Sequence, residues 1–279
     1  MEFLQIKYID VFAVGLIIAF FGLCEFFTNL YGRNSLRDKN DWYVELISTF
    51  QLFVLVKPII YPLSAIIIVS LFPYLKNLFL EANFWLSTIV VILVDDFLHY
   101  WFHRKSHDWN WLWKLHRPHH AAKEMGVLVS YRNAFFFYML MPNIWWLAIA
   151  TFIGLYQQVI LAVIIKQIIV VGAHSELRWD KFLYSKKLFH PFAWFIERFI
   201  STPATHFAHH GKDPDDGVSN PNGNFGNMFF IWDMIFGTGI ITRKYPQNFG
   251  IPNDPNDNWK SHLYYPFIKS KNKKSEISY

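Results

Sequence analysis

The sequence has very little cysteine and few charged residues. Its single cysteine, Cys24, lies inside an apolar run, so no disulfide bond can form within the chain. Any metal ion would therefore be held by nitrogen and oxygen ligands rather than by thiolates. Charged residues make up only 17% of the chain, against about 25% in typical soluble domains. This shortage argues against an ordinary soluble protein.

Positive charge is modest and is not arranged as a nucleic-acid surface. The net charge is +5, the basic residues flank apolar runs, and no nucleic-acid-binding motif accompanies them. Basic residues in such positions are typical of the flanks of membrane segments. We therefore expect membrane lipids as partners and no nucleic acid.

What the chain does have is long apolar runs, with 53% hydrophobic residues among 279. A helix needs about 20 apolar residues to cross a bilayer, which predicts an all-α integral membrane bundle with four to five spans. The run at 46–72 contains Lys57 and Pro62, so it is expected to be kinked, re-entrant or tilted, and Gly154 marks a turn. The candidate runs are 9–30, 46–72, 83–102, 134–153 and 156–173.

Positive charge also predicts the topology. Basic residues cluster at 104–132 and again at 178–198, whereas the turn between the last two runs has none. Because Lys and Arg favour cytoplasmic loops, both regions are expected on the cytoplasmic face, and an even number of spans separates them. The pattern favours a multi-pass protein of a bacterial inner membrane over one of the endoplasmic reticulum. Lys166, inside the last run, is expected to snorkel, face a polar interior or find a partner.

Three clusters contain eight of the twelve histidines. Residues three or four apart on a helix share a face, so each cluster can present its rings together. Pro118 is tolerated only in a first helical turn and limits where a helix over 116–122 begins. Thr202 and Pro203 predict the start of a short helix that Gly211 ends. The clusters are His103-x-x-x-His107, His116-x-x-His119-His120 and His206-x-x-His209-His210.

Eight imidazoles exceed the four ligands of a structural zinc site. They suit two metal ions, each with several nitrogen ligands. Without thiolates, iron and zinc are both reasonable, and the residues themselves leave that choice open.

The motifs around the clusters resemble the fatty acid hydroxylase and sterol desaturase superfamily over roughly residues 90–240. They include Tyr100-Trp-Phe-His-Arg-x-x-His107, Leu112-Trp-x-x-His-x-x-His-His120 and Thr202-Pro-x-x-His-x-x-His-His-Gly211. Ile231-Trp-Asp-x-x-Phe-Gly-Thr238 adds to the resemblance. His174-Ser-Glu176 is similar to a motif of the alkylglycerol monooxygenase branch.

The resemblance implies an O2-dependent lipid oxidoreductase with two iron ions, for which zinc can substitute in a purified protein. Hydroxylation of a fatty acyl, alkyl or sterol-like lipid is the leading expectation. Desaturation, ether-lipid cleavage and a non-redox zinc enzyme are the alternatives. No fused cytochrome b5 or ferredoxin domain is apparent, so a separate electron donor of that kind is expected. The implied metal ligands are His103, His107, His116, His119, His120, His174, His206, His209 and His210.

Acidic neighbours are candidates for orienting ligands or handling protons. We assign this catalytic role to Asp96, Glu124 and Glu176, against the alternative of solvated or paired carboxylates. Arg132 is a candidate for pairing with a glutamate or a substrate headgroup, with a membrane anchor as the alternative.

Some features depart from the resemblance or fall outside it. The residues at His99 and Thr205 differ from those of close relatives, and the segment 177–201 is longer than theirs. His190 and His262 are expected at the surface. The whole chain is expected to form one membrane domain. Its parts are anchor helices at 1–82, a histidine-containing core at 83–240 and a C-terminal tail at 241–279, which is basic over Lys269–Ser275.

Overall fold

The computed structural model describes residues 2–28, 35–254 and 257–270, and these ranges fold almost entirely into helices. The only extended pairing within them is an isolated bridge between Gly211 and Phe249. This confirms the all-α class. Most of the basic stretch Lys269–Ser275 lies outside the described residues.

The apolar runs form the long helices. Between α2 and α3 the chain continues as a π-helical segment, Gln51–Val56, and Pro58 and Pro62 follow it in α3. Prolines remove amide donors, and a π-helical turn is one way in which a helix absorbs such a disturbance. The long elements are α1 (Glu2–Phe27), α2 (Lys39–Phe50), α3 (Lys57–Leu71), α4 (Phe84–Asp108) and α8 (Tyr156–His174).

Shorter helices fill the remaining chain, and several end at the histidines. They are α5 (Asn110–His120), α6 (Phe135–Leu140), α7 (Pro142–Phe152), α9 (Lys181–Ser185), α10 (His190–Phe199), α11 (Pro203–His210), α12 (Ile231–Phe236) and α13 (Trp259–Leu263), with 3-10 turns at Pro73–Leu75, Val127–Tyr131 and Lys187–Phe189.

Three continuous helices among the described residues are long and apolar enough to cross a membrane: Lys39–Leu71, Phe84–Asp108 and Tyr156–His174. Val11–Phe27 of α1 is a shorter apolar helix. The expected span at 134–153 is wrong as a single helix, because the chain breaks at Met141 and α7 restarts at Pro142. Neither piece has the length needed to cross a bilayer. The expected turn at Gly154 is confirmed, with φ +103.

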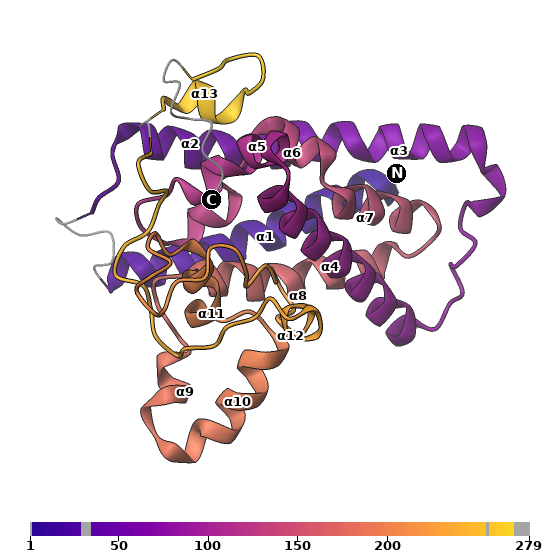
Figure 1. Ribbon diagram of the computed structural model, residues 1–279. Helices are drawn as coiled ribbons and strands as arrows, with labels where there is room; N and C mark the ends of the chain where they lie inside the picture. The colour runs from indigo at the N-terminus through magenta and orange to yellow at the C-terminus, as the bar shows by residue number, and fades with distance from the viewer. Residues whose placement is uncertain (1, 29–34, 255–256, 271–279) are drawn as a thin grey trace.

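The long helices form a bundle with the histidine-bearing segments at one end. Figure 1 shows α1 against α8, α3 and α4 each against α7, and α4 against α8. The short helices α5 and α11 gather where α4 and α8 end. A hairpin made of α9 and α10 projects from the body.

Two polar residues within the apolar helices have close partners. The Lys166 ammonium in α8 forms an ion pair with Asp95 of α4, and Asp95 also accepts a hydrogen bond from Asn143 at 3.2 Å. Pairing lowers the cost of placing a charge among apolar helices. The Lys57 ammonium lies over the ring of Phe53, at 5.0 Å from its centroid.

Candidate metal centre

Four helix ends converge on the histidine centre. His103 and His107 lie near the C-terminus of α4, and His174 is the last residue of α8. The second cluster ends α5 and the third ends α11. Eight of the nine side chains are buried, and His107 is half-buried. All nine histidines that the sequence motifs select therefore lie together.

The start of α11 follows the sequence prediction. The Thr202 hydroxyl accepts a hydrogen bond from the Thr205 amide, and the Thr205 hydroxyl accepts one from the Thr202 amide at 2.9 Å. Pro203 occupies the first turn, and Gly211 follows the last residue. This reciprocal cap satisfies two amide donors that would otherwise be unpaired at a buried helix start.

The prediction for Pro118 is wrong. Helix α5 begins at Asn110, eight residues earlier than Pro118, so the proline lies in the last turn rather than the first. Its carbonyl accepts a hydrogen bond from the Arg132 guanidinium at 2.7 Å. The contact ties the end of α5 to the segment that follows it.

The nine rings form two groups. Within each group, one nitrogen from every histidine lies within 4.8 Å of the others. The groups adjoin, because His120 of the first stacks on His210 of the second with centroids 4.6 Å apart. Group one is His103, His107, His116, His120 and His209, and group two is His119, His174, His206 and His210.

Several rings are oriented by an oxygen on their outer side. The Nδ1–H of His103 donates to the Phe225 carbonyl at 2.7 Å, and that of His209 donates to the Gly223 carbonyl at 2.7 Å. An imidazole protonated at Nδ1 offers its Nε2 lone pair to a metal ion. The same pattern holds for His116 with Asn133 Oδ1 at 2.8 Å, His119 with the Val129 carbonyl at 3.0 Å, and His174 with the Val170 carbonyl at 2.8 Å.

The inner nitrogens approach one another closely. His103 and His209 bring their Nε2 atoms to 3.0 Å, and His174 and His206 bring theirs to 2.9 Å. Within the described residues, the buried Nε2 atoms of His116 and His120 have no hydrogen-bond partner. Converging lone pairs and unpaired buried nitrogens are what a metal-binding donor set requires. The residues fit nitrogen-ligated metal ions.

Electrostatics keep these rings neutral. Burial lowers the pKa of His119, His120 and His210 well below the ordinary value of 6.5, and neighbouring imidazoles lower it further. A neutral imidazole is the form that binds metal.

A loop that sequence reasoning passed over holds two of the rings. Asp233 of α12 accepts hydrogen bonds from the amides of Phe225 and Gly226 at 2.8 and 2.6 Å. A methyl group at Gly226 would lie 2.6 Å from the Phe229 carbonyl, so the loop would have to shift to accept any larger residue. Asp233 thereby fixes the carbonyl to which His103 donates. The signal was present in the Trp-Asp-x-x-Phe-Gly motif.

Asn133 is a second residue that sequence reasoning missed. Its backbone carbonyl accepts hydrogen bonds from the side chains of Ser48 and Gln51, at 2.6 and 3.1 Å. Its amide oxygen is then held against Nδ1 of His116. No pattern in the sequence marks this role, because it depends on a contact between distant helices.

The three predicted acidic residues lie around the centre rather than in either histidine group. Asp96 accepts hydrogen bonds from the Phe229 amide at 2.9 Å and the Trp232 indole at 3.0 Å. Glu124 pairs with Arg37 at 2.9 Å, and Glu176 pairs with Arg178 at 2.8 Å.

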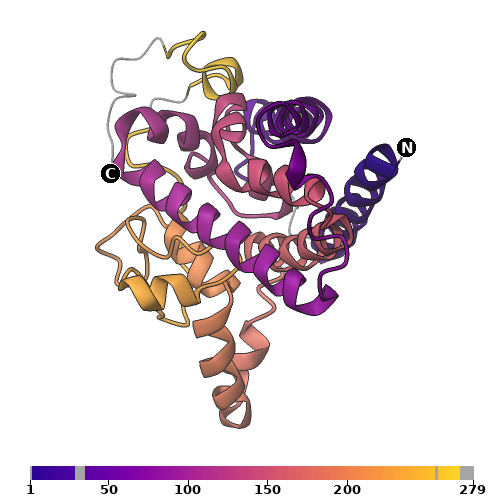
Figure 2. The ribbon, with the colours of Figure 1, turned by 90° about the vertical axis from the view of Figure 1, so that its right-hand side faces the viewer.

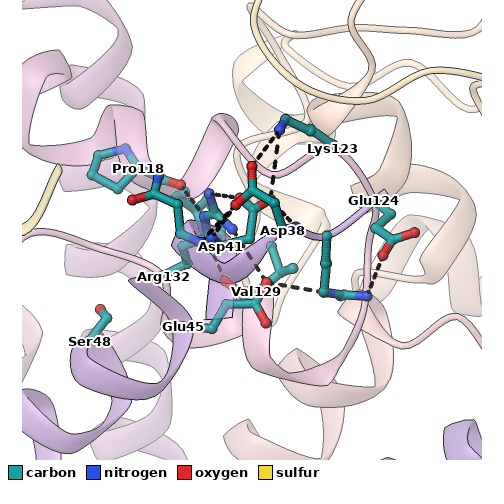
Figure 3. Close-up of polar contacts among 12 residues, drawn as sticks. Asp38, Asp41, Glu45, Ser48, Pro118, Lys123, Glu124, Val129 and Arg132 are labelled. Atoms are coloured by element: carbon teal, nitrogen blue, oxygen red, sulfur yellow. Dashed lines mark hydrogen bonds and ion pairs between the residues drawn. The ribbon is translucent and has the colours of Figure 1, made fainter. Parts of the chain in front are cut away.

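Arg132 is buried and paired rather than free for a substrate. Figure 3 shows its guanidinium beside Asp41 and Glu45, at 2.7 and 3.3 Å. It therefore joins α2 to the end of α5. The predicted pairing with a glutamate is confirmed by Glu45, whereas the alternatives of a headgroup ligand and a membrane anchor are not supported by these contacts. The same view shows Lys123 reaching Asp38 at 3.2 Å.

The remaining histidines stand apart from the two groups. The ring of His99 lies 6.3 Å from that of His103, and its Nδ1 faces the Asn227 amide at 3.4 Å. His190 is half-buried. The expectation that His262 lies at the surface is wrong, because α13 buries it to 5% exposure.

A cavity adjoins the centre on the side of the long helices. His103, His116 and His119 line one part of it. Other walls come from α7 and α8, including Ile144 and Val163. Asn227, Lys57 and Lys166 add polar groups. The lining is therefore mixed, with apolar residues of α7 and α8 beside histidine, lysine and amide groups.

The sequence comparison identifies the family. A model described as fatty acid hydroxylase matches residues 88–238, which is more than half of the chain and contains all nine histidines. The chain belongs to the fatty acid hydroxylase family.

The chain is similar to alkylglycerol monooxygenases. It is 25% identical over 165 residues to that of Xenopus tropicalis, covering 58% of this chain and 31% of the relative. For Danio rerio the identity is 26% over 199 residues, covering 67% and 37%, and for Homo sapiens it is 25% over 154 residues, covering 55% and 30%. The chain spans about a third of the length of these curated relatives. No solved structure matches it.

Proposed function

We propose that this protein is a membrane-bound, O2-dependent lipid oxidoreductase with two iron ions. The leading reaction is hydroxylation of a C–H bond in a fatty acyl, alkyl or sterol-like lipid. The observation that carries the proposal is the pair of adjoining buried histidine groups. Membership of the fatty acid hydroxylase family supports the class of chemistry.

The chain's own residues would divide the work as follows. The five histidines of group one would together hold one iron, and the four of group two would hold the other. Iron bound by such ligands supplies the power to activate O2 and oxidise a C–H bond. Carbonyl and amide oxygens fix the ring orientations, and burial keeps the imidazoles neutral.

The cavity beside the two histidine groups would receive the lipid. Its position brings bound substrate next to His103, His116 and His119. The apolar part of the lining, which includes Ile144 and Val163, would surround the reacting carbon and limit its contact with water.

The three acidic residues would act by positioning. Asp96 holds the 228–232 segment, Glu124 ties the end of α5 to Arg37, and Glu176 follows the ligand His174. In this proposal none of them touches the substrate.

We place the histidine centre on the cytoplasmic face, where the basic regions beside the spans are expected. A bacterial inner membrane suits the sequence best. A separate donor such as a cytochrome b5 or a ferredoxin would then supply electrons from the cytoplasm.

The function is tested by lipid analysis of cells with and without the gene, combined with assays of the iron-loaded protein. Wild type is expected to form an oxidised lipid only with O2 and a reductant, and His209→Ala is expected to abolish it. His190→Ala is the matched control, because His190 lies outside both groups. An unchanged lipid profile, together with an iron-loaded protein inert toward all lipid classes, would refute the proposal.

Ether-lipid cleavage is the second candidate, favoured by the similarity to alkylglycerol monooxygenases. Labelled oxygen distinguishes the reactions. A hydroxylated or cleaved product carries oxygen from 18O2, and an aldehyde fragment identifies cleavage. A desaturated product carries no label. Product formation without O2 or reductant would instead indicate a non-redox zinc enzyme.

A further inference from the structure

The hairpin made of α9 and α10, residues 181–199, has an exposed surface that the histidine chemistry does not use. Phe182, Leu188, Phe192 and Phe195 are each more than 60% exposed, and Trp194 is 55% exposed. Such large apolar side chains, gathered on one projecting segment, mark an interaction surface.

The exposed charges on this hairpin are of one sign. Lys181, Lys186 and Lys187 are exposed, and Arg198 is half-buried. The one acidic residue, Glu197, is buried to 2% and pairs with Arg243 at 2.7 Å. The outer surface is therefore aromatic and basic, which is the composition of segments that lie in the headgroup region of an anionic bilayer.

The base of the hairpin is fixed to the body. Asp180 accepts a hydrogen bond from the Ala204 amide at 2.7 Å. The Phe230 amide donates to the Phe199 carbonyl at 3.0 Å. The rings of Phe199 and Phe229 lie 5.3 Å apart. A rigid base with an exposed apolar tip indicates that the tip contacts something outside the chain.

The orientation of the hairpin agrees with a position along a membrane surface. Helix α3 runs across Figure 1 and is seen end-on in Figure 2, whereas the hairpin points downward in both views. The hairpin is therefore crosswise to α3, which belongs to a membrane-length helix. A segment crosswise to a spanning helix extends along the membrane plane.

The position of the hairpin agrees with that orientation. Only residues 175–180 separate it from the end of α8, a second membrane-length helix. Helix α10 contacts α12, in which Ile235 is exposed, and the ring of Trp232 in α12 lies 5.2 Å from that of Phe97 in α4. The hairpin thus begins near the end of one candidate span, α8, and lies close to the exposed side of another, α4.

We propose that the α9–α10 hairpin is an interfacial anchor that inserts its aromatic side chains among anionic lipid headgroups. It links His174 to His206, so its depth in the bilayer sets the height of group two above the lipid. The proposal is independent of the reaction, because it concerns only where the hairpin lies.

The test uses the full chain in bilayers. In a Cys24→Ser background, Leu188→Cys or Phe192→Cys is labelled with an environment-sensitive fluorophore, and Asp215→Cys, on an exposed loop, is the matched control. The protein is reconstituted in phosphatidylcholine with phosphatidylglycerol, including lipids that carry a nitroxide quencher near the headgroup. Iron content and a single elution peak verify folding.

Labels at 188 and 192 are expected to be quenched at least about twofold more than the label at 215. Lys186→Gln with Lys187→Gln, or a bilayer of phosphatidylcholine alone, is expected to reduce that difference. Equal quenching at all three sites would overturn the proposal. Energy transfer between labelled copies that disappears when the protein is diluted with lipid would indicate self-association of the hairpin. That result would also overturn the proposal.

Discussion

Five of the nine clustered histidines have their outer nitrogen fixed by an oxygen acceptor. This contact selects the tautomer that points Nε2 into the group. Four of the acceptors are backbone carbonyls, and the fifth is the side chain of Asn133. His116 is therefore the one of these five histidines whose acceptor can be removed by substituting a single side chain.

Asn133→Ala removes the oxygen that holds His116. We expect iron affinity to fall about 10- to 100-fold, as for other residues that orient a ligand. Asn133→Asp retains an acceptor and is expected to lose much less. Chelator competition measures the affinity. Asn110→Ala, at an exposed position of α5, the helix that carries His116, is the control. Unchanged affinity in Asn133→Ala would show that this contact does not orient the ligand.

The neutral imidazoles also predict a pH dependence of the metal-free protein. Burial holds the pKa of His116, His206 and His209 well below 6.5 in the folded state. Below the unfolded value of about 6.5, the unfolded chain binds protons that the folded chain does not. Stability is therefore retained above that pH and lost as the pH falls.

We expect the thermal midpoint of the metal-free protein to fall between about pH 6.5 and pH 5.5, with little change above pH 6.5. Thermal unfolding in detergent measures it. A thermal midpoint that rises as the pH is lowered from about 6.5 to about 5.5 would mean that the rings are charged in the folded protein.

Among the elements, α11 and the loop at 223–240 position the third cluster and His103. Helix α11 brings its own start signal, so its boundaries follow from Thr202, Pro203 and Gly211. Residues 223–230 form no helix and are held by Asp233 of α12, whose pKa burial raises to about 6. The close approach at Gly226 is then as important for the shape of this loop as the carboxylate of Asp233.

Gly226→Ala places a methyl group 2.6 Å from the Phe229 carbonyl and 2.7 Å from Asp233. We expect a loss of about 1–3 kcal/mol in the free energy of unfolding, because the loop must shift. Iron content is expected to fall as well. Gly22→Ala, where no atom lies within 4 Å of the new methyl group, is the control. Equal stability of the two variants in thermal unfolding would contradict this account of the loop.

The elements show what the sequence could predict and what it could not. Apolar length predicted the helices that became α3, α4 and α8, and motif spacing selected all nine histidines. The run at 134–153 was misjudged because composition does not show that the chain breaks before Pro142. Asn133 was missed because its role depends on contacts with residues more than 80 positions away.

At the scale of the whole molecule, the long helices deliver four helix ends to one place. The ends of α4, α5, α8 and α11 supply the nine rings, and a cavity lies between the rings and the apolar helices. The hairpin lies crosswise to α3, and in the anchor proposal this relates the height of the centre to the membrane surface. In the proposed function, this arrangement would let a lipid be oxidised without leaving the bilayer.

The central claim is that the nine histidines hold two metal ions, and iron counting of the purified protein after anaerobic loading tests it most directly. Two irons per chain are expected for wild type and for His190→Ala. His107→Ala, in group one, and His174→Ala, in group two, are each expected to bring the number toward one. A wild-type protein that binds one iron or none, or a His190→Ala variant that loses as much iron as the other two, would contradict the account.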